Sequence, residues 1–327
     1  MDTLDLVRAN LLSPMVLAFV LGVVARLARS DLKLPEGIYA ALSIYLLFAI
    51  GLKGGVSLSA TPVAEVWLPA VAATLFGAVA PVWIYAVVRG AGRMSVADAA
   101  ALAAHYGSVS VVTFTAAIAF LDTIGLAYEG YMPALVALME IPAIVVALVI
   151  ARVRTPRDTQ AAPTPWSEVL HEVLAGRGSV LLIGGLTIGL LSGASGFAQV
   201  APFFDAPFKG VLVFFLLEMG MVAAGRLGDL RRAGAFLVAF GVLMPVVHGA
   251  MGVALGWAIG LSVGGSTVLG VLAASASYIA APVAVRIALP EANPGYYLTA
   301  TLAITFPFNL AVGIPLYHAI SVLLHAS

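Results

Sequence analysis

Two long apolar segments of this chain, 96–121 and 264–287, are interrupted by glycine and hydroxyl residues. Glycine and proline weaken a continuous helix, and serine or threonine can cap a broken one. The N-terminus of a half-helix offers free backbone N–H groups and a positive dipole end, which bind an anion without a buried lysine. We therefore predict a binding site for a small anion, formed by Gly107, Ser108, Val109, Ser110, Ser275, Ala276, Ser277 and Tyr278.

Side chains that carry oxygen can hold a cation beside this anion. Glu140 lies inside an apolar segment, where an ionisable group is costly and is usually functional or paired. It can bind Na⁺ or carry a proton, and the competing interpretation is a hydrogen bond to a neighbouring helix. Thr305 and Asn309 have oxygens suited to Na⁺, although polar residues at a packed helix contact are the alternative for both. The predicted Na⁺ ligands are Ser110, Thr113, Glu140, Thr305 and Asn309.

Lys53 and Glu218 are a further pair of ionisable residues within apolar segments. An internal repeat, described below, aligns each of these residues about one helical turn from the residue equivalent to the other. If the two helices meet near the axis that relates the two halves of the repeat, the side chains form a buried ion pair. We predict a structural role for this pair, with gating as the alternative.

The composition is that of a membrane protein. Of 327 residues 62% are hydrophobic and 10% are charged, whereas a soluble domain carries about 25% charged residues. Between the charged clusters lie stretches long enough to cross a hydrocarbon core, which takes about 20 helical residues. They lack the alternation of barrel strands, so helices are the remaining way to satisfy the backbone in lipid. We predict an all-α polytopic membrane protein.

Ten transmembrane helices are expected, with a strong charge bias between their loops. Of the 16 lysines and arginines, 13 follow odd-numbered segments and three (Arg8, Lys53 and Lys209) lie on the other side. The positive-inside rule then places both termini outside the cytoplasm, in a multi-pass plasma-membrane protein. The predicted segments are 12–28, 37–52, 66–88, 96–121, 131–151, 179–193, 208–225, 233–260, 264–287 and 296–324.

Other classes of protein are disfavoured by what the sequence lacks. Net charge is zero and no basic tract occurs, which argues against nucleic acid as a partner. Cysteine is absent, so disulfides and thiolate metal sites are excluded. There is no HExxH or GxSxG motif, and the five histidines are scattered singly. We expect no enzyme and no cofactor, with Na⁺ as coupling ion only.

Three weak internal matches occur in the same order at nearly one spacing. Residues 46–55 align with 215–224 at an offset of 169, residues 103–108 with 273–278 at 170, and residues 140–142 with 305–307 at 165. Five helices per unit is an odd number, so the second unit enters the membrane inverted, as in many secondary transporters. We predict repeats at 1–152 and 179–327, joined by a cytoplasmic linker, 153–178. Matched positions favour an anion site over mere close packing at the two interruptions.

The sequence resembles the sodium-dependent bicarbonate transporters of the SbtA type over nearly its whole length. The motifs that carry the resemblance are residues 51–55, 219–221, 226–231, 245–249, 273–277, 292–294 and 313–316. The family usually has an aspartate at the position of Tyr278, and Glu140 takes the place of another aspartate. The resemblance implies Na⁺-coupled bicarbonate uptake across the plasma membrane, a core and a gate domain, a homotrimer and a PII-like regulatory protein bound on the cytoplasmic side.

The leading hypothesis is therefore secondary active transport, a sodium-coupled uptake of bicarbonate by alternating access. One alternative is transport of another small anion or an organic acid with sodium or proton coupling, in which Glu140 carries the proton. Another is an anion channel, since channels use similar broken helices.

Overall fold

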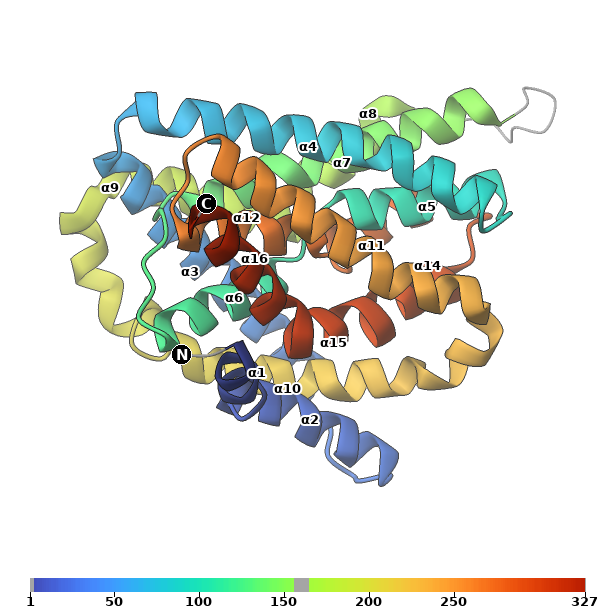
Figure 1. The fold of residues 1–327 in the computed structure, drawn as a ribbon, viewed down its shortest axis with the longest axis horizontal. Helices are drawn as coiled ribbons and strands as arrows, with labels where there is room; N and C mark the ends of the chain where they lie inside the picture. Colours follow the sequence, from blue (N-terminus) through green and yellow to red (C-terminus); the bar gives the residue numbers. More distant parts are fainter. Residues whose placement is uncertain (1–2, 156–164, 327) are drawn as a thin grey trace.

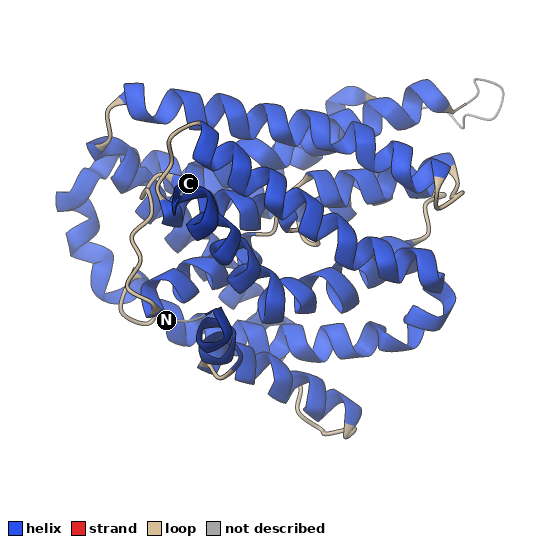
Figure 2. Cartoon of the chain, in the orientation of Figure 1, coloured by secondary structure: helices blue, strands red, loops and turns tan. Residues whose placement is uncertain are grey.

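The computed structural model describes residues 3–155 and 165–326, and every regular element in these ranges is helical (Figures 1 and 2). The predicted linker therefore lies partly outside the described residues. The first helices are α1 (Thr3–Leu11), α2 (Pro14–Leu27), α3 (Glu36–Ala60), α4 (Val63–Gly90), α5 (Val96–Gly107), α6 (Val111–Thr123) and α7 (Met132–Arg154). The remainder are α8 (Trp166–Ala175), α9 (Arg177–Phe204), α10 (Phe208–Arg226), α11 (Leu230–Ala258), α12 (Val263–Ala274), α13 (Ala280–Ala288), α14 (Pro294–Leu298), α15 (Phe306–Phe308) and α16 (Ile314–Ala326), with π-helical turns η3 (Thr299–Thr305) and η4 (Asn309–Gly313).

Within the described residues, eight helical stretches are long and apolar enough to cross a membrane. Each overlaps one of the predicted segments. The two remaining predicted segments, 12–28 and 264–287, do not match a helix of spanning length. They correspond to the shorter apolar helices α2 and α12, and α12 is followed by a break and then by α13. The chain is an all-helical polytopic membrane protein, as predicted.

The turns that carry arginine or lysine lie at one end of the molecule. In Figure 1 the turns from α2 to α3, from α4 to α5, from α10 to α11 and from α13 to α14 all lie at the right-hand end. Both termini lie toward the left-hand end. These four turns, which the positive-inside rule groups together by sequence, are therefore also grouped in space.

The helices pack in two groups. α2, α3, α9 and α10, here called the scaffold group, pack on one another through close backbone contacts. A Cβ atom at Gly22 of α2 would lie 2.0 Å from the Leu217 carbonyl oxygen of α10, and one at Gly189 of α9 would lie 2.2 Å from the Leu52 oxygen of α3. Small residues allow such approach between membrane helices. The remaining spanning helices, α4–α7 and α11–α16, form the broken-helix group.

One glycine ends a predicted segment for a conformational reason. Gly193 interrupts α9 with φ 59° and ψ −166°, a left-handed backbone that L side chains rarely adopt. Figure 1 shows α9 curving around the left-hand end of the molecule. The predicted segment 179–193 thus ends where the straight part of the helix ends.

The interrupted helices lie in the interior. Every residue from Ala99 to Ala117 is buried, and α12 is buried from Gly264 to Ala274. Irregular backbone is tolerated at membrane depth only where protein or a cavity encloses it. In Figure 2 loop segments interrupt the helices near the middle of the bundle, where these breaks lie.

Candidate functional site

The first break separates α5 from α6. α5 ends at Gly107, Ser108 is extended with φ −86° and ψ 178°, and α6 begins at Val111. Ser110 is the N-cap of α6, and its hydroxyl oxygen accepts a hydrogen bond from the Thr113 N–H at 3.2 Å. Such a cap satisfies one of the free N–H groups of the new helix and leaves others available.

The second break separates α12 from α13 in a similar way. α12 ends at Ala274, Ser275 is extended with φ −79° and ψ 166°, and α13 begins at Ala280. The Ser277 hydroxyl oxygen accepts a hydrogen bond from the Ala281 N–H at 3.2 Å. Ser277 therefore satisfies one free N–H group in the first turn of α13 from within the break, where Ile279 is the N-cap residue.

The two breaks are hydrogen-bonded directly to each other. The Ser110 N–H donates to the Ser275 hydroxyl oxygen at 2.8 Å, and the Ser277 N–H donates to the His105 carbonyl oxygen at 2.8 Å. Backbone polar groups buried without hydrogen-bond partners are costly, so each break provides a hydrogen-bond acceptor for a backbone N–H group of the other. The prediction that residues 105–110 and 275–280 meet as interrupted helices is confirmed in this geometry.

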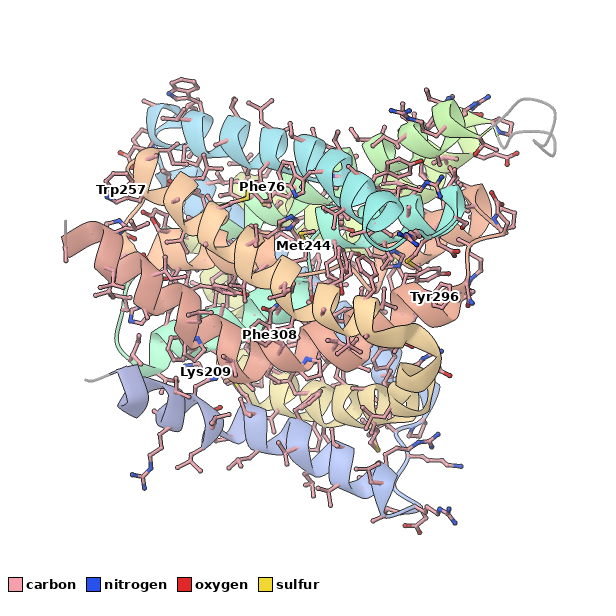
Figure 3. The ribbon with its side chains drawn as sticks, turned by 45° about the vertical axis from the view of Figure 1, so that its right-hand side comes forward. Phe76, Lys209, Met244, Trp257, Tyr296 and Phe308 are labelled. Atoms are coloured by element: carbon pink, nitrogen blue, oxygen red, sulfur yellow. The ribbon has the colours of Figure 1, made fainter. Side chains whose placement is uncertain are left out.

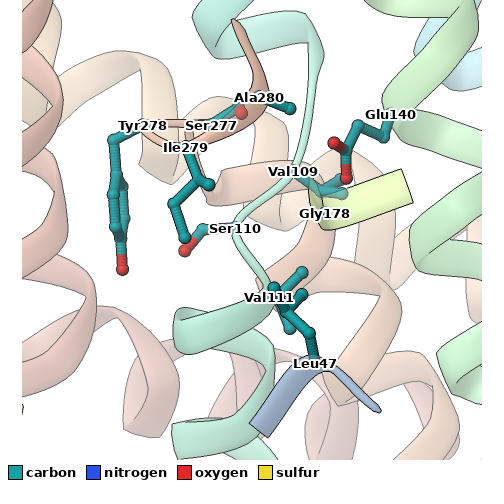
Figure 4. A pocket seen from close by; sticks show the side chains of 10 residues that line it. All are labelled: Leu47, Val109, Ser110, Val111, Glu140, Gly178, Ser277, Tyr278, Ile279 and Ala280. Atoms are coloured by element: carbon teal, nitrogen blue, oxygen red, sulfur yellow. The ribbon is translucent and has the colours of Figure 1, made fainter. Parts of the chain in front are cut away.

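A small cavity of about 20 Å³ lies at the beginnings of both half-helices. Figure 4 shows Glu140 and Tyr278 flanking the two breaks from opposite sides of this cavity. Val109, Ser110, Ser277 and Tyr278 are four of the eight predicted anion-site residues. The lining residues are Leu47, Val109, Ser110, Val111, Glu140, Gly178, Ser277, Tyr278, Ile279 and Ala280.

The other four predicted anion-site residues are buried beside the cavity without lining it. A Cβ atom at Gly107 would lie 2.6 Å from Pro81 Cγ, so this glycine allows the break to pack on α4. The Ser108 hydroxyl is buried with no hydrogen-bond partner in the described part of the chain. Ser275 holds the crossing through its hydroxyl, and Ala276 is 4% exposed.

Glu140 brings a carboxylate to the cavity. It lies on α7, is 6% exposed, and has no hydrogen bond or ion pair among the described residues. Figure 4 shows its carboxylate directed toward Val109 and Gly178. A charged group in this position calls for a cation or a proton, because an isolated buried charge is very costly.

The structure does not bring all the predicted Na⁺ ligands together. Ser110 and Glu140 line the cavity, and Thr113, Thr305 and Asn309 do not. The Thr305 hydroxyl donates to the Gly241 carbonyl oxygen at 2.6 Å and is hydrogen-bonded to the Tyr106 hydroxyl at 2.7 Å. Asn309 donates to the Ala274 carbonyl oxygen at 2.9 Å and accepts from the Tyr317 hydroxyl at 2.9 Å. Both side chains hold helices together.

The predicted ion pair between Lys53 and Glu218 is wrong. Lys53 forms an ion pair with Asp205 and lies 4.6 Å from the centre of the Phe208 ring. Glu218 lies instead at the other end of α3, where it interacts with the Leu34 backbone and with Tyr39. Lys53 is fourteen residues beyond Tyr39, roughly 21 Å along the helix.

The helix bounds also contradict the predicted offset of 170 between the two interrupted segments. α5 and α12 begin at Val96 and Val263 and end at Gly107 and Ala274, so both ends are 167 residues apart. The predicted offset of 170 paired the break after Ala274 with His105, which lies inside α5 and is buried. Ser110 and Ser277 are separated by the same 167 residues. The N–H-bearing residues Val111, Ile279 and Ala280 were missed, and the capping serines beside them were the available signal.

These observations define an all-helical polytopic membrane protein with a small cavity where two interrupted helices cross. No group of three or more His, Cys, Asp or Glu residues that could hold a metal ion occurs among the described residues. The sequence profile of the Na⁺-dependent bicarbonate transporter superfamily matches residues 14–322, which include both breaks and every residue that lines the cavity.

The chain therefore belongs to the Na⁺-dependent bicarbonate transporter superfamily, a family of membrane transporters rather than enzymes. A search among curated proteins found no match.

Proposed function

We propose that this protein is a secondary active transporter that takes up bicarbonate together with Na⁺ by alternating access. The observation that carries the proposal is the pair of hydrogen bonds joining the breaks, from Ser110 to Ser275 and from Ser277 to His105. They hold the N-termini of α6 and α13 at one cavity. Free N–H groups and positive dipole ends there suit a small oxyanion, and among the described residues no lysine or arginine lines the cavity.

In this proposal Glu140 and Ser110 bind the Na⁺. A carboxylate and a hydroxyl oxygen are ligands of the type that Na⁺ prefers, and both line the same cavity as the half-helix N-termini. Na⁺ at Glu140 neutralises the carboxylate that would otherwise repel the anion. Binding of either ion then favours binding of the other, which is the basis of coupled transport.

The proposed inverted repeats, 1–152 and 179–327 with the linker 153–178, account for the paired geometry. α5 and α12 have twelve residues each and begin after the capping serines Ser95 and Ser262. Near the start of each helix, a carboxylate accepts a backbone N–H across the halves of the chain. Asp98 accepts from Asn293 at 2.7 Å, and Glu129 accepts from Ser262 at 2.7 Å. Contacts across the halves near the start of both helices support this arrangement, although the carboxylate lies on α5 in one contact and outside α12 in the other.

Transport also requires a change of conformation. A cavity of about 20 Å³ holds about one water molecule, so the bicarbonate site must widen to accept its ligand. We propose that the broken-helix group moves against the scaffold group and thereby opens the cavity to each side in turn. The homotrimer, the PII-like cytoplasmic regulator and the plasma-membrane location are what the family resemblance implies. The positive-inside rule adds that both termini lie outside the cytoplasm.

Uptake into proteoliposomes tests this function. Labelled bicarbonate is supplied with and without an inward Na⁺ gradient, and the parent protein is compared with the Glu140→Gln variant. We expect saturable uptake that follows the Na⁺ gradient in the parent and is lost in the variant. Uptake that follows a proton gradient alone indicates proton coupling through Glu140, uptake that does not saturate indicates a channel, and absence of uptake under every gradient rejects the assignment.

A further inference from the structure

A second and larger cavity lies at the end of the molecule away from the arginine-rich turns. Its volume is about 390 Å³, within the range of small-molecule sites. Figure 3 shows Lys209, one of its lining residues, at the same end as Trp257 and opposite Tyr296. The polar and charged side chains that line it are Lys53, Ser57, Asp122, Tyr128, Asp205 and Lys209.

The positive charges of this end are concentrated in the cavity. Of the three basic residues assigned to this side, Arg8, Lys53 and Lys209, two line this one cavity. Each lysine is paired with an aspartate, Lys53 with Asp205 and Lys209 with Asp122. The carboxylates balance the ammonium groups, so displacement of either carboxylate leaves a positive charge available to an anion.

The two ion pairs differ in what they connect. Lys53 of α3 and Asp205, which directly follows α9, both belong to the scaffold group, and the Phe208 ring also contacts this lysine. Lys209 of α10 reaches Asp122 near the end of α6 at 3.2 Å, and its side chain is 55% exposed. Of these two pairs, the second joins the scaffold group to the broken-helix group.

α6 links this outer cavity to the central cavity. Val111 at its beginning lines the central cavity, and Asp122 at its other end lines the outer one. Eleven residues of helix separate them, roughly 17 Å. A change at Asp122 is therefore transmitted through a single rigid helix to the N-terminus that we assign to the anion.

We propose that the outer cavity is a second, low-affinity site for a small oxyanion of the carboxylate or carbonate type, in which the anion replaces Asp122 as the partner of Lys209. This inference rests on the proposed function, because the anion bound here is the one that is transported. A solvent-exposed ion pair is weak, so an anion at high concentration competes with Asp122 effectively. Once Asp122 is released, α6 loses its ion pair with α10. Lys53 keeps Asp205 and Phe208 as its partners, so the anion gains its charge contact from Lys209.

The natural absence of cysteine makes a direct test possible, because Ser57→Cys introduces a single thiol that lines the cavity. The protein is placed in lipid nanodiscs, where both ends are accessible. The rate of maleimide labelling is then measured against bicarbonate at constant ionic strength, with chloride as the balancing anion. We expect bicarbonate to slow labelling several-fold, and Lys209→Gln to raise the half-maximal bicarbonate concentration by up to about fivefold, the upper end for one solvent-exposed ion pair.

Two further variants serve as controls. Lys209→Arg keeps the charge and should retain most of the protection, and it reports on folding of the altered site. Lys33→Gln removes an exposed lysine at the opposite end and should leave protection unchanged. The site is refuted if chloride slows maleimide labelling as well as bicarbonate does. It is also refuted if the half-maximal bicarbonate concentration for protection is the same in Lys209→Gln as in the parent. Labelling requires no transport, so protection without uptake contradicts only the proposed function, and uptake without protection contradicts only this site.

Discussion

The first and second helix breaks resemble each other and differ in the residue that flanks each of them. Ser110 and Ser277 each accept a backbone N–H from the first turn of the half-helix that follows, and both line the same cavity. Glu140, which flanks the first break from α7, has no hydrogen bond or ion pair in the described part of the chain. Thr305, which the sequence alignment paired with Glu140 at an offset of 165, is held by Gly241 and Tyr106. Two similar breaks can therefore meet at one cavity while a carboxylate flanks only one of them.

Substitution of Glu140 should have the largest effect. We expect Glu140→Gln to lower Na⁺-driven uptake at least about 100-fold, at the upper end of the losses seen when groups around a bound ion are removed. The matched variant Thr305→Val should keep uptake per folded molecule within about threefold, because its hydroxyl only joins helices. Initial rates in proteoliposomes measure both. Equal losses in the two variants would show that the half-sites are alike.

Ser275→Ala should have the next largest effect, on stability. The Ser275 hydroxyl accepts from the buried Ser110 N–H, and loss of a buried partner costs about 1–3 kcal/mol. At the separation of 167 residues its counterpart is Ser108, whose buried hydroxyl has no partner among the described residues. Ser108→Ala should therefore change the free energy of unfolding by less than about 0.5 kcal/mol. Denaturant unfolding in detergent compares the two, and a larger loss for Ser108→Ala contradicts the crossing described here.

Ser110 and Ser277 should behave as equals. Ser110→Ala removes an N-cap, which costs about 1 kcal/mol. Ser277→Ala removes the hydroxyl that accepts the Ala281 N–H in the first turn of α13, and we expect a similar cost. Because the breaks contact each other, the double variant should depart from additivity by at least about 0.5 kcal/mol. The same unfolding measurement gives this coupling energy. Strict additivity would mean that the two breaks are energetically independent.

The smallest effects are expected where the halves contact each other at the surface. Asp98→Asn and Glu129→Gln each weaken a carboxylate contact near a helix N-terminus, worth about 0.3–1 kcal/mol. Both contacts are open to solvent, so the loss should shrink at high salt. Thermal unfolding at low and high ionic strength checks this. A large effect from one variant alone would argue against paired repeats.

Much of this architecture could be predicted from residue types. Long apolar runs between clustered arginines indicated the spanning helices, since lipid leaves the backbone few other structures. The hydroxyl residues between Gly107 and Val111 and between Ala274 and Ala280 marked the breaks, because serine caps a new helix. Glu140 was identifiable because an isolated carboxylate in an apolar segment is rarely without a role.

The parts of the site that could not be predicted from the sequence depend on how the helices are placed relative to one another. Lys53 and Glu218 were expected to meet, but they lie near opposite ends of α3, which an alignment of apolar residues could not establish. Asn309 and Thr305 have the oxygens that Na⁺ prefers, yet the choice between binding an ion and binding a helix depends on which carbonyl lies nearby. The offset of 170 failed because alanine-rich helices match one another equally well in several registers.

The central claim is that the anion and the cation bind in one cavity, with Glu140 beside two half-helix N-termini. Equilibrium binding of radioactive Na⁺ to the purified protein, measured with and without bicarbonate, tests it most directly. Linkage predicts that bicarbonate raises the Na⁺ affinity severalfold, and that Glu140→Gln removes both the binding and its dependence on bicarbonate. Na⁺ binding that is indifferent to bicarbonate and unchanged in Glu140→Gln would contradict the account.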